Sequence, residues 1–450
     1  MKNIRRVVSI LLFFSFVIFT CYADITNAEI DSSDDVGSYS SITVDGQGHL
    51  AISFYDATNG SLKLWKDLDG SETADVGEIN VIDNSTLDIG KHTDITTDKD
   101  GHLAVVYYDA INTNLKLWLD LDDSGTSSVA EITIIDSSGS TGLTSSITKD
   151  SDGKLVVAYY VSDLRDLRLW VDDDYSGTSN VGEIRVIDST GATGSYPSAV
   201  LDSSGVLAVA FRNSTTKDLM LWRDSVVKNG AFDSGEIITI DDSTVSTGIN
   251  PDIMIDGNGH LAVSYRDSSN GDLKLWVDDD GSDTSSPMEI RTIDADGSKG
   301  SYSEISLDGE GHIAISYYDG TNSNRMIWID KNGDYLSDVD EIFTLNSSGN
   351  AGFLPSGMVL YQDRLALSYS DDTNNSLVLA IQDVQGASFT FSNQIIYSDA
   401  SRGAYLKRDK CLISGANSNA TMFFVCILIM FLVLQLGVKM SHIHIDIFEK

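Results

Sequence analysis

The chain of 450 residues repeats a pattern every 52 to 54 residues. A glycine opens each of seven units, and all six tryptophans fall at one later position of the repeat. The glycines are Gly37, Gly90, Gly142, Gly194, Gly248, Gly300 and Gly352, and the tryptophans are Trp65, Trp118, Trp170, Trp222, Trp276 and Trp328. A unit of this length cannot bury its apolar surface alone, so neighbouring units must pack against one another.

Each unit reads as four short antiparallel strands. In the unit that begins at Gly300 we expect strands over 301–307, 312–318, 324–329 and 341–345, separated by polar turns. The second strand is apolar or small on both faces: residues 50–55 put Leu, Ile and Phe on one face and Ala, Ser and Tyr on the other. Such a sheet needs neighbours on both sides.

Radial packing of seven such sheets satisfies this requirement. We therefore predict an all-β fold, a seven-bladed β-propeller of four-stranded antiparallel blades, over residues 24–415. A linear solenoid would need capping repeats, which the chain lacks. Residues 27–31 echo the fourth-strand pattern of 78–83, so we expect this segment to close the ring. In the alternative, residues 403–405 open an eighth, partial blade made from both ends.

Both ends of the chain carry targeting signals. Basic Lys2, Arg5 and Arg6 precede an apolar run and a small-residue site at Ala23, which predicts a signal peptide over 1–23. An uncleaved anchor is the alternative. Residues 420–438 carry no charge and would span about 28 Å as a helix, which predicts a transmembrane helix before a polar tail at 439–450. A cleaved glycolipid-anchor signal is the alternative. We expect a single-pass protein with its bulk outside the cell.

The formal net charge is −37, and this charge disfavours nucleic acid as a partner because it repels phosphate. It favours cations instead. Of three cysteines, only Cys411 would lie in the mature, water-soluble part, so no internal disulfide is expected. We expect a monomer whose partner is an extracellular protein or glycan.

An acidic loop follows five of the six tryptophans with one shared spacing. Oxygen-bearing side chains stand at positions 1, 3, 5 and 9, and a glutamate stands at position 12. This spacing matches that of calcium loops, in which six to eight oxygens surround the ion. The predicted Ca²⁺ ligands are Asp67, Asp69, Ser71, Asp75 and Glu78; Asp120, Asp122, Ser124 and Glu131; Asp172, Asp174, Ser176, Asn180 and Glu183; Asp278, Asp280, Ser282 and Glu289; and Asp330, Asn332, Asp334, Asp338 and Glu341.

The loops also depart from the calcium pattern. Only the second and third carry glycine at position 6, as Gly125 and Gly177. The loop over 224–236 is one residue longer and contains Val226, Val227 and Lys228, so we expect no metal there. The alternative for all of these loops is a set of solvated acidic hairpins that aid solubility.

The recurring pattern D-G-x-G-H-L-A-[IV]-S-[FY]-Y-D resembles repeats of secreted β-propellers. The acidic loops resemble, by analogy, the calcium loops of integrin α-subunit and bacterial pilus-tip propellers. This resemblance implies a propeller that uses calcium outside the cell.

The first strand of each unit is expected to line a central channel. The second residue after each opening glycine varies (Tyr39, His92, Thr144, Tyr196, Asn250, Tyr302 and Leu354), and so does the fourth (Ser41, Asp94, Ser146, Ser198, Asp252, Glu304 and Ser356). Variation within regular units indicates a ligand surface. His49, His102, His260 and His312 share one turn position, one to a unit, and we interpret them as structural.

We predict a cell-surface, calcium-binding propeller that acts as a binding or adhesion module and is not an enzyme. One alternative is a secreted glycan-processing hydrolase or lyase that uses Asp94, Asp252 and Glu304. The chain lacks the sialidase S-x-D-x-G-x-T-W turn, H-E-x-x-H and any nucleophile elbow. The other alternative is a structural envelope component.

Overall fold

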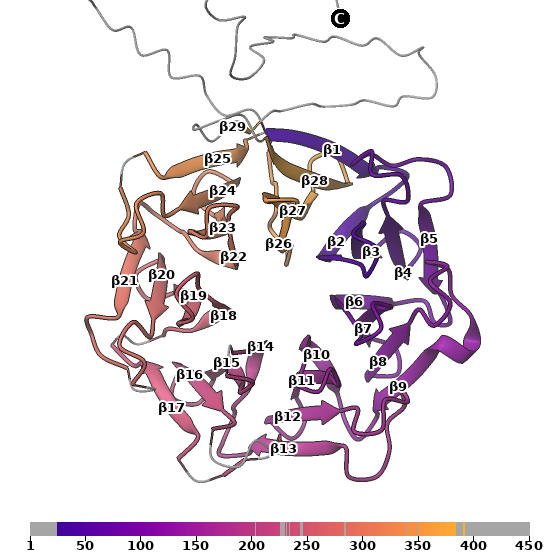
Figure 1. The fold of residues 1–450 in the computed structure, drawn as a ribbon, viewed down its shortest axis with the longest axis horizontal. Helices are drawn as coiled ribbons and strands as arrows, with labels where there is room; N and C mark the ends of the chain where they lie inside the picture. The colour runs from indigo at the N-terminus through magenta and orange to yellow at the C-terminus, as the bar shows by residue number, and fades with distance from the viewer. Residues whose placement is uncertain are drawn as a thin grey trace, which may run out of the picture.

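The computed structural model describes residues 25–383 and 390–391, apart from 203, 226–229, 231, 234, 244, 245, 283, 284, 339 and 348. Its strands form seven antiparallel sheets arranged around one axis (Figure 1). The predicted seven-bladed propeller of four-stranded blades is confirmed, and the solenoid alternative is wrong. The expected signal peptide, transmembrane helix, polar tail and partial eighth blade lie outside the described residues.

Within a blade the strands follow from the axis outward in chain order. Blade 1 holds β2 (Val36–Val44), β3 (Leu50–Asp56), β4 (Ser61–Lys66) and β5 (Ile79–Asp83). Blade 2 holds β6 (Ile89–Thr97), β7 (Leu103–Asp109), β8 (Asn114–Leu119) and β9 (Ile132–Asp136), with the short 3₁₀ helix η1 (Val129–Glu131) before β9. Blade 3 holds β10 (Thr141–Lys149), β11 (Leu155–Val161), β12 (Asp166–Val171) and β13 (Ile184–Asp188).

Blade 4 holds β14 (Ser195–Leu201), β15 (Leu207–Asn213), β16 (Asp218–Arg223) and β17 (Ile237–Asp241). Blade 5 holds β18 (Ile249–Ile255), β19 (Leu261–Asp267), β20 (Asp272–Val277) and β21 (Ile290–Asp294). Blade 6 holds β22 (Ser301–Leu307), β23 (Ile313–Asp319), β24 (Asn324–Ile329) and β25 (Ile342–Asn346). No helix among the described residues is long and apolar enough to cross a membrane.

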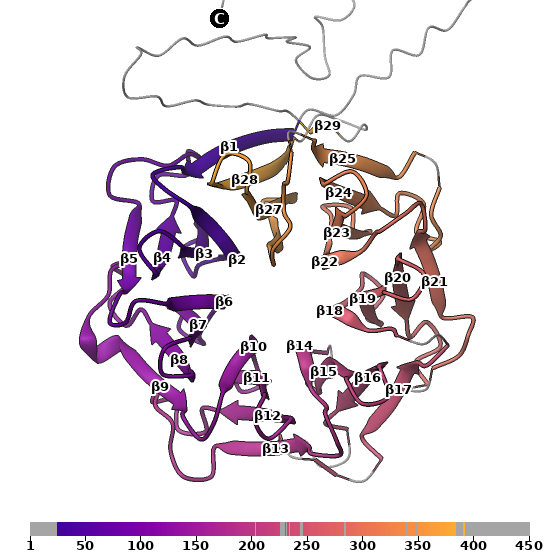
Figure 2. The same ribbon diagram turned by 180° about the vertical axis from the view of Figure 1, so that it is seen from behind.

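Blade 7 is built from both ends of the described chain. It holds β26 (Gly357–Tyr361), β27 (Arg364–Asp371) and β28 (Ser376–Asp383), and its outer strand is β1 (Ile25–Asp31), with β29 (Thr390–Phe391) also paired to β28. β1 runs antiparallel to β28, and β26 packs against β2 (Figures 1 and 2). Closure by the N-terminal strand, the first expectation from the sequence, is confirmed.

The hydrophobic cores lie between blades rather than within them. One cluster joins Val106 and Leu117 of blade 2 to Val157 and Tyr159 of blade 3. The tryptophan near the end of the third strand is fully buried in all six blades that carry one. Each sheet is therefore apolar on both faces because it forms half of two cores.

The opening glycines are required by the contact between successive blades. Gly194 has φ of +86°, and a Cβ there would lie 2.5 Å from the Cβ of Leu167 in the preceding blade. Six of the seven opening glycines meet a leucine in this way, and Gly352 meets Arg325 instead. A side chain here would be strained in φ and would clash with the neighbouring blade.

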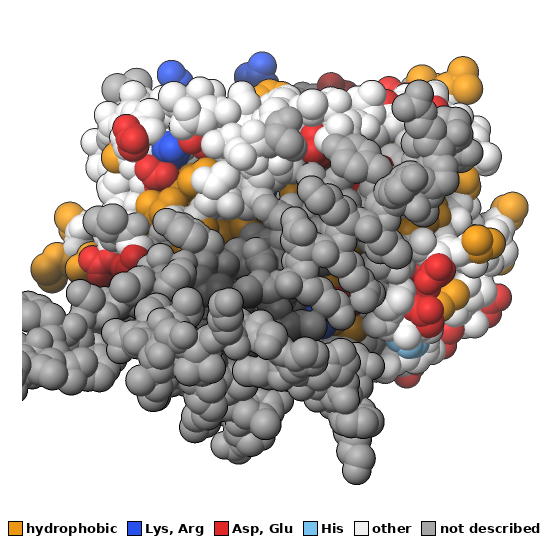
Figure 3. Space-filling view, turned by 90° about the horizontal axis from the view of Figure 1, so that it is seen from above, with side chains coloured by type: hydrophobic (Ala, Val, Ile, Leu, Met, Phe, Trp, Pro, Cys, Tyr) orange, Lys and Arg blue, Asp and Glu red, His pale blue; other side chains and the backbone are white. Residues whose placement is uncertain are grey.

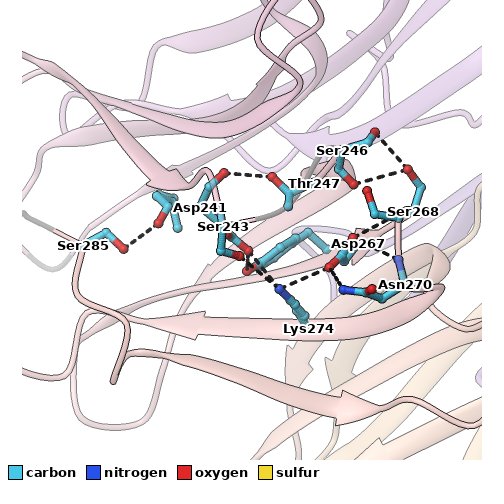
Figure 4. Close-up of polar contacts among 12 residues, drawn as sticks. Asp241, Ser243, Ser246, Thr247, Asp267, Ser268, Asn270, Lys274 and Ser285 are labelled. Carbon is cyan, nitrogen blue, oxygen red and sulfur yellow. Dashed lines mark hydrogen bonds and ion pairs between the residues drawn. The ribbon is translucent and has the colours of Figure 1, made fainter.

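Buried ion pairs join adjacent blades at the outer strands. Asp241, at the end of β17, accepts a hydrogen bond from the Tyr265 hydroxyl at 2.6 Å and pairs with Lys274 at 3.2 Å (Figure 4). Lys274 also pairs with Asp267 at 3.3 Å. Burial alone would raise the pKa of Asp241, but hydrogen bonds from Ser243 and Tyr265 and the charge of Lys274 hold it below its ordinary value. The same arrangement joins Asp83 to Tyr107 and Lys116, and Asp136 to Tyr159 and Arg168.

Candidate functional site

The alternating strand direction divides the connections between two faces of the ring. The loops from third to fourth strand share one face with the turns from first to second strand, as the 3.0 Å pair of Lys66 with Asp45 shows. We call this the acidic-loop face, defined by residues 67–78, 120–131, 172–183, 224–236, 278–289 and 330–341. The opening glycines and the residues that follow them lie at the opposite end of the first strands, which we call the channel-mouth face.

Each acidic loop curls around its first aspartate. In the second loop the backbone N–H groups of Ser124 and Gly125 donate to the Asp120 carboxylate at 3.1 and 2.9 Å. Ser124 N–H also donates to Asp122 at 3.1 Å, and the N–H of Ser128 donates to Glu131 at 2.7 Å. These bonds draw the side chains at positions 1, 3 and 12 toward one point.

Four loops thereby bring three carboxylates together. In each loop, one oxygen from position 1, one from position 3 and one from position 12 all lie within 4.8 Å of one another. We call these groups the carboxylate triads: Asp67, Asp69 and Glu78; Asp120, Asp122 and Glu131; Asp172, Asp174 and Glu183; and Asp278, Asp280 and Glu289. All were predicted ligands. The remaining predicted positions, Ser71, Asp75, Ser124, Ser176, Asn180 and Ser282, lie on the rims of these loops.

The triads have a high electrostatic cost in the absence of a cation. Their first and last members are buried, and burial raises the pKa of Asp120 to about 6, with a further contribution from the charge of Glu131. Burial likewise raises the pKa of Asp67, Asp172 and Asp278. Within the described part of the chain, no triad carboxylate has an ion-pair partner. Several carboxylates between blades, such as Asp83, Asp136 and Asp241, are paired with lysine or arginine instead.

The sixth loop has the same curl but a different charge distribution. Asp330 accepts hydrogen bonds from the N–H groups of Gly333 and Tyr335. Asn332 replaces the aspartate at position 3, and its amide donates to both Asp334 and Asp338 at 3.2 Å. A similar contact occurs in the third loop, where the Asn180 amide donates to Asp174 at 3.0 Å, so the sixth loop differs mainly in having an uncharged side chain at position 3. The structure does not gather Glu341 and these residues into a triad.

The glutamate at position 12 also lies near the buried tryptophan. In the fourth and sixth loops the indole N–H of Trp222 and Trp328 donates to Glu236 and Glu341, each at 3.2 Å. In the four loops with triads the indole nitrogen of Trp65, Trp118, Trp170 and Trp276 is buried without an acceptor. The glutamates are otherwise held alike, because Glu341 accepts the N–H groups of Lys331 and Asp338 just as Glu78 accepts those of Leu68 and Asp75.

The recurrent histidines contact the aspartate of their own turn. Nδ1 of His102 lies 3.0 Å from Asp98, and His49 and His260 make the equivalent contact at 3.4 and 3.3 Å. This agrees with the structural interpretation. Asp98, Asp100 and His102 also form one further group of potential ligand atoms within 4.8 Å, which the sequence analysis missed. The spacing of Asp98, Asp100 and His102 at alternate positions of one turn was the sequence signal for this group. Asp100 already forms an ion pair with Lys99, so this group differs from the triads in having a positively charged partner.

On the channel-mouth side the first strands line a cavity of about 150 Å³. All seven of the fourth residues after the opening glycines contribute to it, as expected. Asp94 accepts hydrogen bonds from Ser41 Oγ and from the Ile147 N–H, each at 2.8 Å. Asp252 repeats this with Ser198 at 2.7 Å and Ile305 at 2.8 Å. These two carboxylates therefore link neighbouring blades as well as lining the cavity.

The second residues after the opening glycines form the rim of this cavity. Five of them are not glycine yet have left-handed backbone: Tyr39, His92, Tyr196, Asn250 and Tyr302, with φ between 47° and 54°. The rings of Tyr39 and His92 lie 4.2 Å apart. Burial, together with the charge of Lys91, lowers the pKa of His92 to about 4, so its ring is neutral at physiological pH.

Seen edge-on, the ring carries acidic side chains along its visible outer surface, with exposed apolar side chains between them (Figure 3). The exposed apolar residues include Val76, Val129 and Val181, each two positions before the glutamate of a triad. Many other acidic side chains are not on the surface, because the first and last triad carboxylates and the aspartates between blades are buried.

No family model and no curated protein matches the chain. Solved structures do resemble it. Hydrazine synthase of Kuenenia stuttgartiensis is 13% identical with a TM-score of 0.50, over 78% of this chain and 96% of that one. The polysaccharide lyase Uly1 is 12% identical with a TM-score of 0.47, over 76% and 89%. The Dos1 propeller is 9% identical with a TM-score of 0.45, over 78% and 81%. At these identities the likeness concerns the fold alone.

Proposed function

We propose that this protein is a calcium-binding β-propeller that serves as a cell-surface binding module for an extracellular protein or glycan. The main observation that supports metal binding is the set of four carboxylate triads without ion-pair partners among the described residues. Elsewhere in the same protein, buried aspartates are matched by Lys63, Lys116, Arg168 or Lys274. A bound cation would supply the missing positive charge in the loops.

Calcium suits these loops better than other cations. The donors are carboxylate and hydroxyl oxygens, with no cysteine or histidine, which is the chemistry of a hard cation. A glutamate at position 12 can offer both oxygens. In the fifth loop Glu289 Oε1 is buried and accepts no hydrogen bond, so an acceptor is available there. Calcium tolerates the seven or eight ligands and irregular geometry of such a loop, whereas magnesium requires a near-ideal octahedron.

The backbone of each loop holds its glutamate in position. Both oxygens of Glu78 accept N–H groups of their own loop, from Leu68 at 2.8 Å and from Asp75 at 2.9 Å, and Glu183 is held in the same way. The loop therefore fixes a third carboxylate beside the two aspartates at a like-charge cost, which a cation at each triad would remove.

The role as a binding module rests on the scaffold and on the predicted targeting signals. Inter-blade ion pairs and shared cores make a rigid frame, while the cavity-lining positions differ from blade to blade. The segments 1–23 and 420–438 predict display outside the cell, where calcium is millimolar and weak sites are filled. Calcium would order the loops of one face.

Isothermal titration calorimetry on the chelator-treated protein tests the metal. We expect about four calcium equivalents, with Kd values of roughly 10⁻⁵ to 10⁻³ M and at least tenfold weaker binding of magnesium. A flat calcium titration, or equal binding of both ions, would contradict the proposal. A titration that saturates at one equivalent would contradict the assignment to four triads.

A further inference from the structure

The cavity on the channel-mouth face is lined by three acids, and Arg325, whose charge acts on Glu304, is fully buried outside the lining. Three carboxylates, Asp94, Asp252 and Glu304, come from blades 2, 5 and 6, and no lysine or arginine is among the lining residues. His92 is the one basic side chain in the lining, and it is neutral. Lys91 stands near the rim but is paired with Asp88 at 2.8 Å. An anionic ligand would be repelled from this cavity.

Glu304 is the carboxylate that remains available. Asp94 and Asp252 each accept hydrogen bonds from a serine and from the backbone of the next blade, whereas Glu304 has the backbone of Ser356 as its partner. Arg325 approaches from the core side but bonds to Ser316, Ser356 and two backbone carbonyls, and it forms no ion pair with Glu304 within 4.0 Å. Burial, together with the charges of Asp252 and Asp94, raises the pKa of Glu304 well above its ordinary value, and the charge of Arg325 opposes this rise. A cation bound beside Glu304 would favour the ionised carboxylate.

The arrangement favours an extended cation over a bare metal ion. Unlike the triads, the three channel carboxylates do not place their oxygens within 4.8 Å of one another. Asp252 and Glu304 come from adjacent blades and act on each other electrostatically, whereas Asp94 comes from blade 2 across the ring. A protonated amine can donate to Glu304 and Asp252 while neutral hydroxyls reach the other side of the cavity.

The walls indicate that the rest of the ligand is polyhydroxyl. Eight of the eighteen lining residues are serine or threonine, and Ser145 Oγ is buried without a partner. The rim carries the rings of Tyr196 and Tyr302, which can cover the C–H face of a sugar. Pro197, Pro251 and Pro355 also line the cavity, so lysine, an amine with an apolar stem, is the competing ligand that the test must separate from an amino sugar.

We infer that this cavity is a binding site for a protonated amino sugar, with Glu304 and Asp252 receiving the ammonium group and Tyr196 and Tyr302 covering the ring. The inference rests on the proposed role as a binding module and names its ligand class. It does not depend on the triads, because these lie on the opposite face. Failure of the calcium titration would therefore leave it intact, and its own failure would leave calcium binding intact.

Ligand-observed NMR titration of the full protein with glucosamine, glucose and glucuronate tests the inference, because these three sugars share one ring configuration and differ in charge. We expect glucosamine at pH 6.5 to bind at least tenfold more tightly than glucose, and glucuronate not to bind. The variant E304Q should weaken glucosamine at least tenfold and leave glucose unchanged. E310Q makes the same charge change at an exposed turn of the acidic-loop face and should change neither.

A second variant separates binding from folding. Y302N removes the rim ring at a position where blade 5 already accommodates Asn250 with the same left-handed backbone. It should weaken both glucosamine and glucose while the melting temperature is retained. Equal binding of glucosamine and glucose, unchanged glucosamine binding by E304Q, or tighter binding of lysine methyl ester than of glucosamine would each overturn the proposal.

Discussion

Removal of one charged side chain from a triad is expected to reduce calcium-dependent stability by a calculable amount. The variant is D122N in the second loop. Asn keeps an oxygen that can accept the Ser124 N–H but removes one of the three negative charges near the proposed ion. The adjacent D123N is the matched control: Asp123 is exposed, lies outside the triad and has φ of 57°, a conformation that Asn tolerates.

The magnitude follows from linkage and from the size of the fold. A site at a hundredfold excess of calcium over Kd stabilises the folded state by about 2.7 kcal/mol. Unfolding about 360 residues has an entropy near 0.76 kcal/mol/K, so each site raises the melting temperature by about 3.5 °C. Four sites together should give about 14 °C. If D122N weakens its site about a hundredfold, that site retains about 0.4 kcal/mol, and the calcium-induced shift falls by about 3 °C.

Differential scanning calorimetry with excess chelator and then with excess calcium measures this shift. D123N should show the full wild-type shift. In chelator, D122N should not melt below the wild type, because the substitution relieves repulsion among Asp120, Asp122 and Glu131. Equal calcium-induced shifts in D122N and D123N, or no shift in the wild-type protein, would refute the reasoning.

Three further outcomes are expected. In chelator, the free energy of unfolding measured in urea should rise as the pH falls from about 7 to 5, because the folded-state pKa values of Asp120 and Asp252 are raised to about 6. It should then fall below about pH 4, because the folded-state pKa values of Asp83 and Asp241 are lowered. A steady decline from pH 7 would contradict this prediction. G194A should lower the free energy of unfolding by at least about 3 kcal/mol, through backbone strain and a clash with Leu167. The control G48A, at φ of +90° with open space around it, should lower it by about 1–2 kcal/mol. Similar losses for the two variants in urea titrations would be inconsistent with the packing role of Gly194. I30A should lose about 2–5 kcal/mol, because Ile30 on β1 is buried in the core that closes the ring, and a change below 1 kcal/mol would argue against closure by β1.

Much of the fold could be predicted because its signals are local and repeated. The expected strands over 301–307 and 324–329 agree with β22 and β24, and the other two strands of that unit are shifted by one residue. Alternation along a strand, turn residues and the period between units are all properties of neighbouring residues. The echo of a fourth strand at 27–31 was enough to predict closure by β1.

The candidate calcium loops were predictable for the same reason. All members of a triad lie within twelve consecutive residues, so their spacing along the chain was enough to identify them as candidate ligands. Spacing did not distinguish the sixth loop, where Asn332 takes over the neighbouring carboxylates and Glu341 accepts from Trp328. The residue type at position 3 does distinguish it, because Asn332 carries no charge, whereas its amide bonds to Asp334 and Asp338 are seen only in the structure.

The sequence by itself determined the repeating four-stranded blade and the order of the blades, and it favoured seven blades closed by the N-terminal strand over eight, because periodicity and alternation need no knowledge of distant neighbours. Tertiary structure alone decided what the channel residues do. The partners of Asp94 are Ser41 and Ile147, each 53 positions away, and Lys274 meets Asp241 across 33 positions. Contacts of that range arise only once the ring brings one blade against the next; their separations follow the repeat, but the repeat alone does not say which side chains of two blades meet.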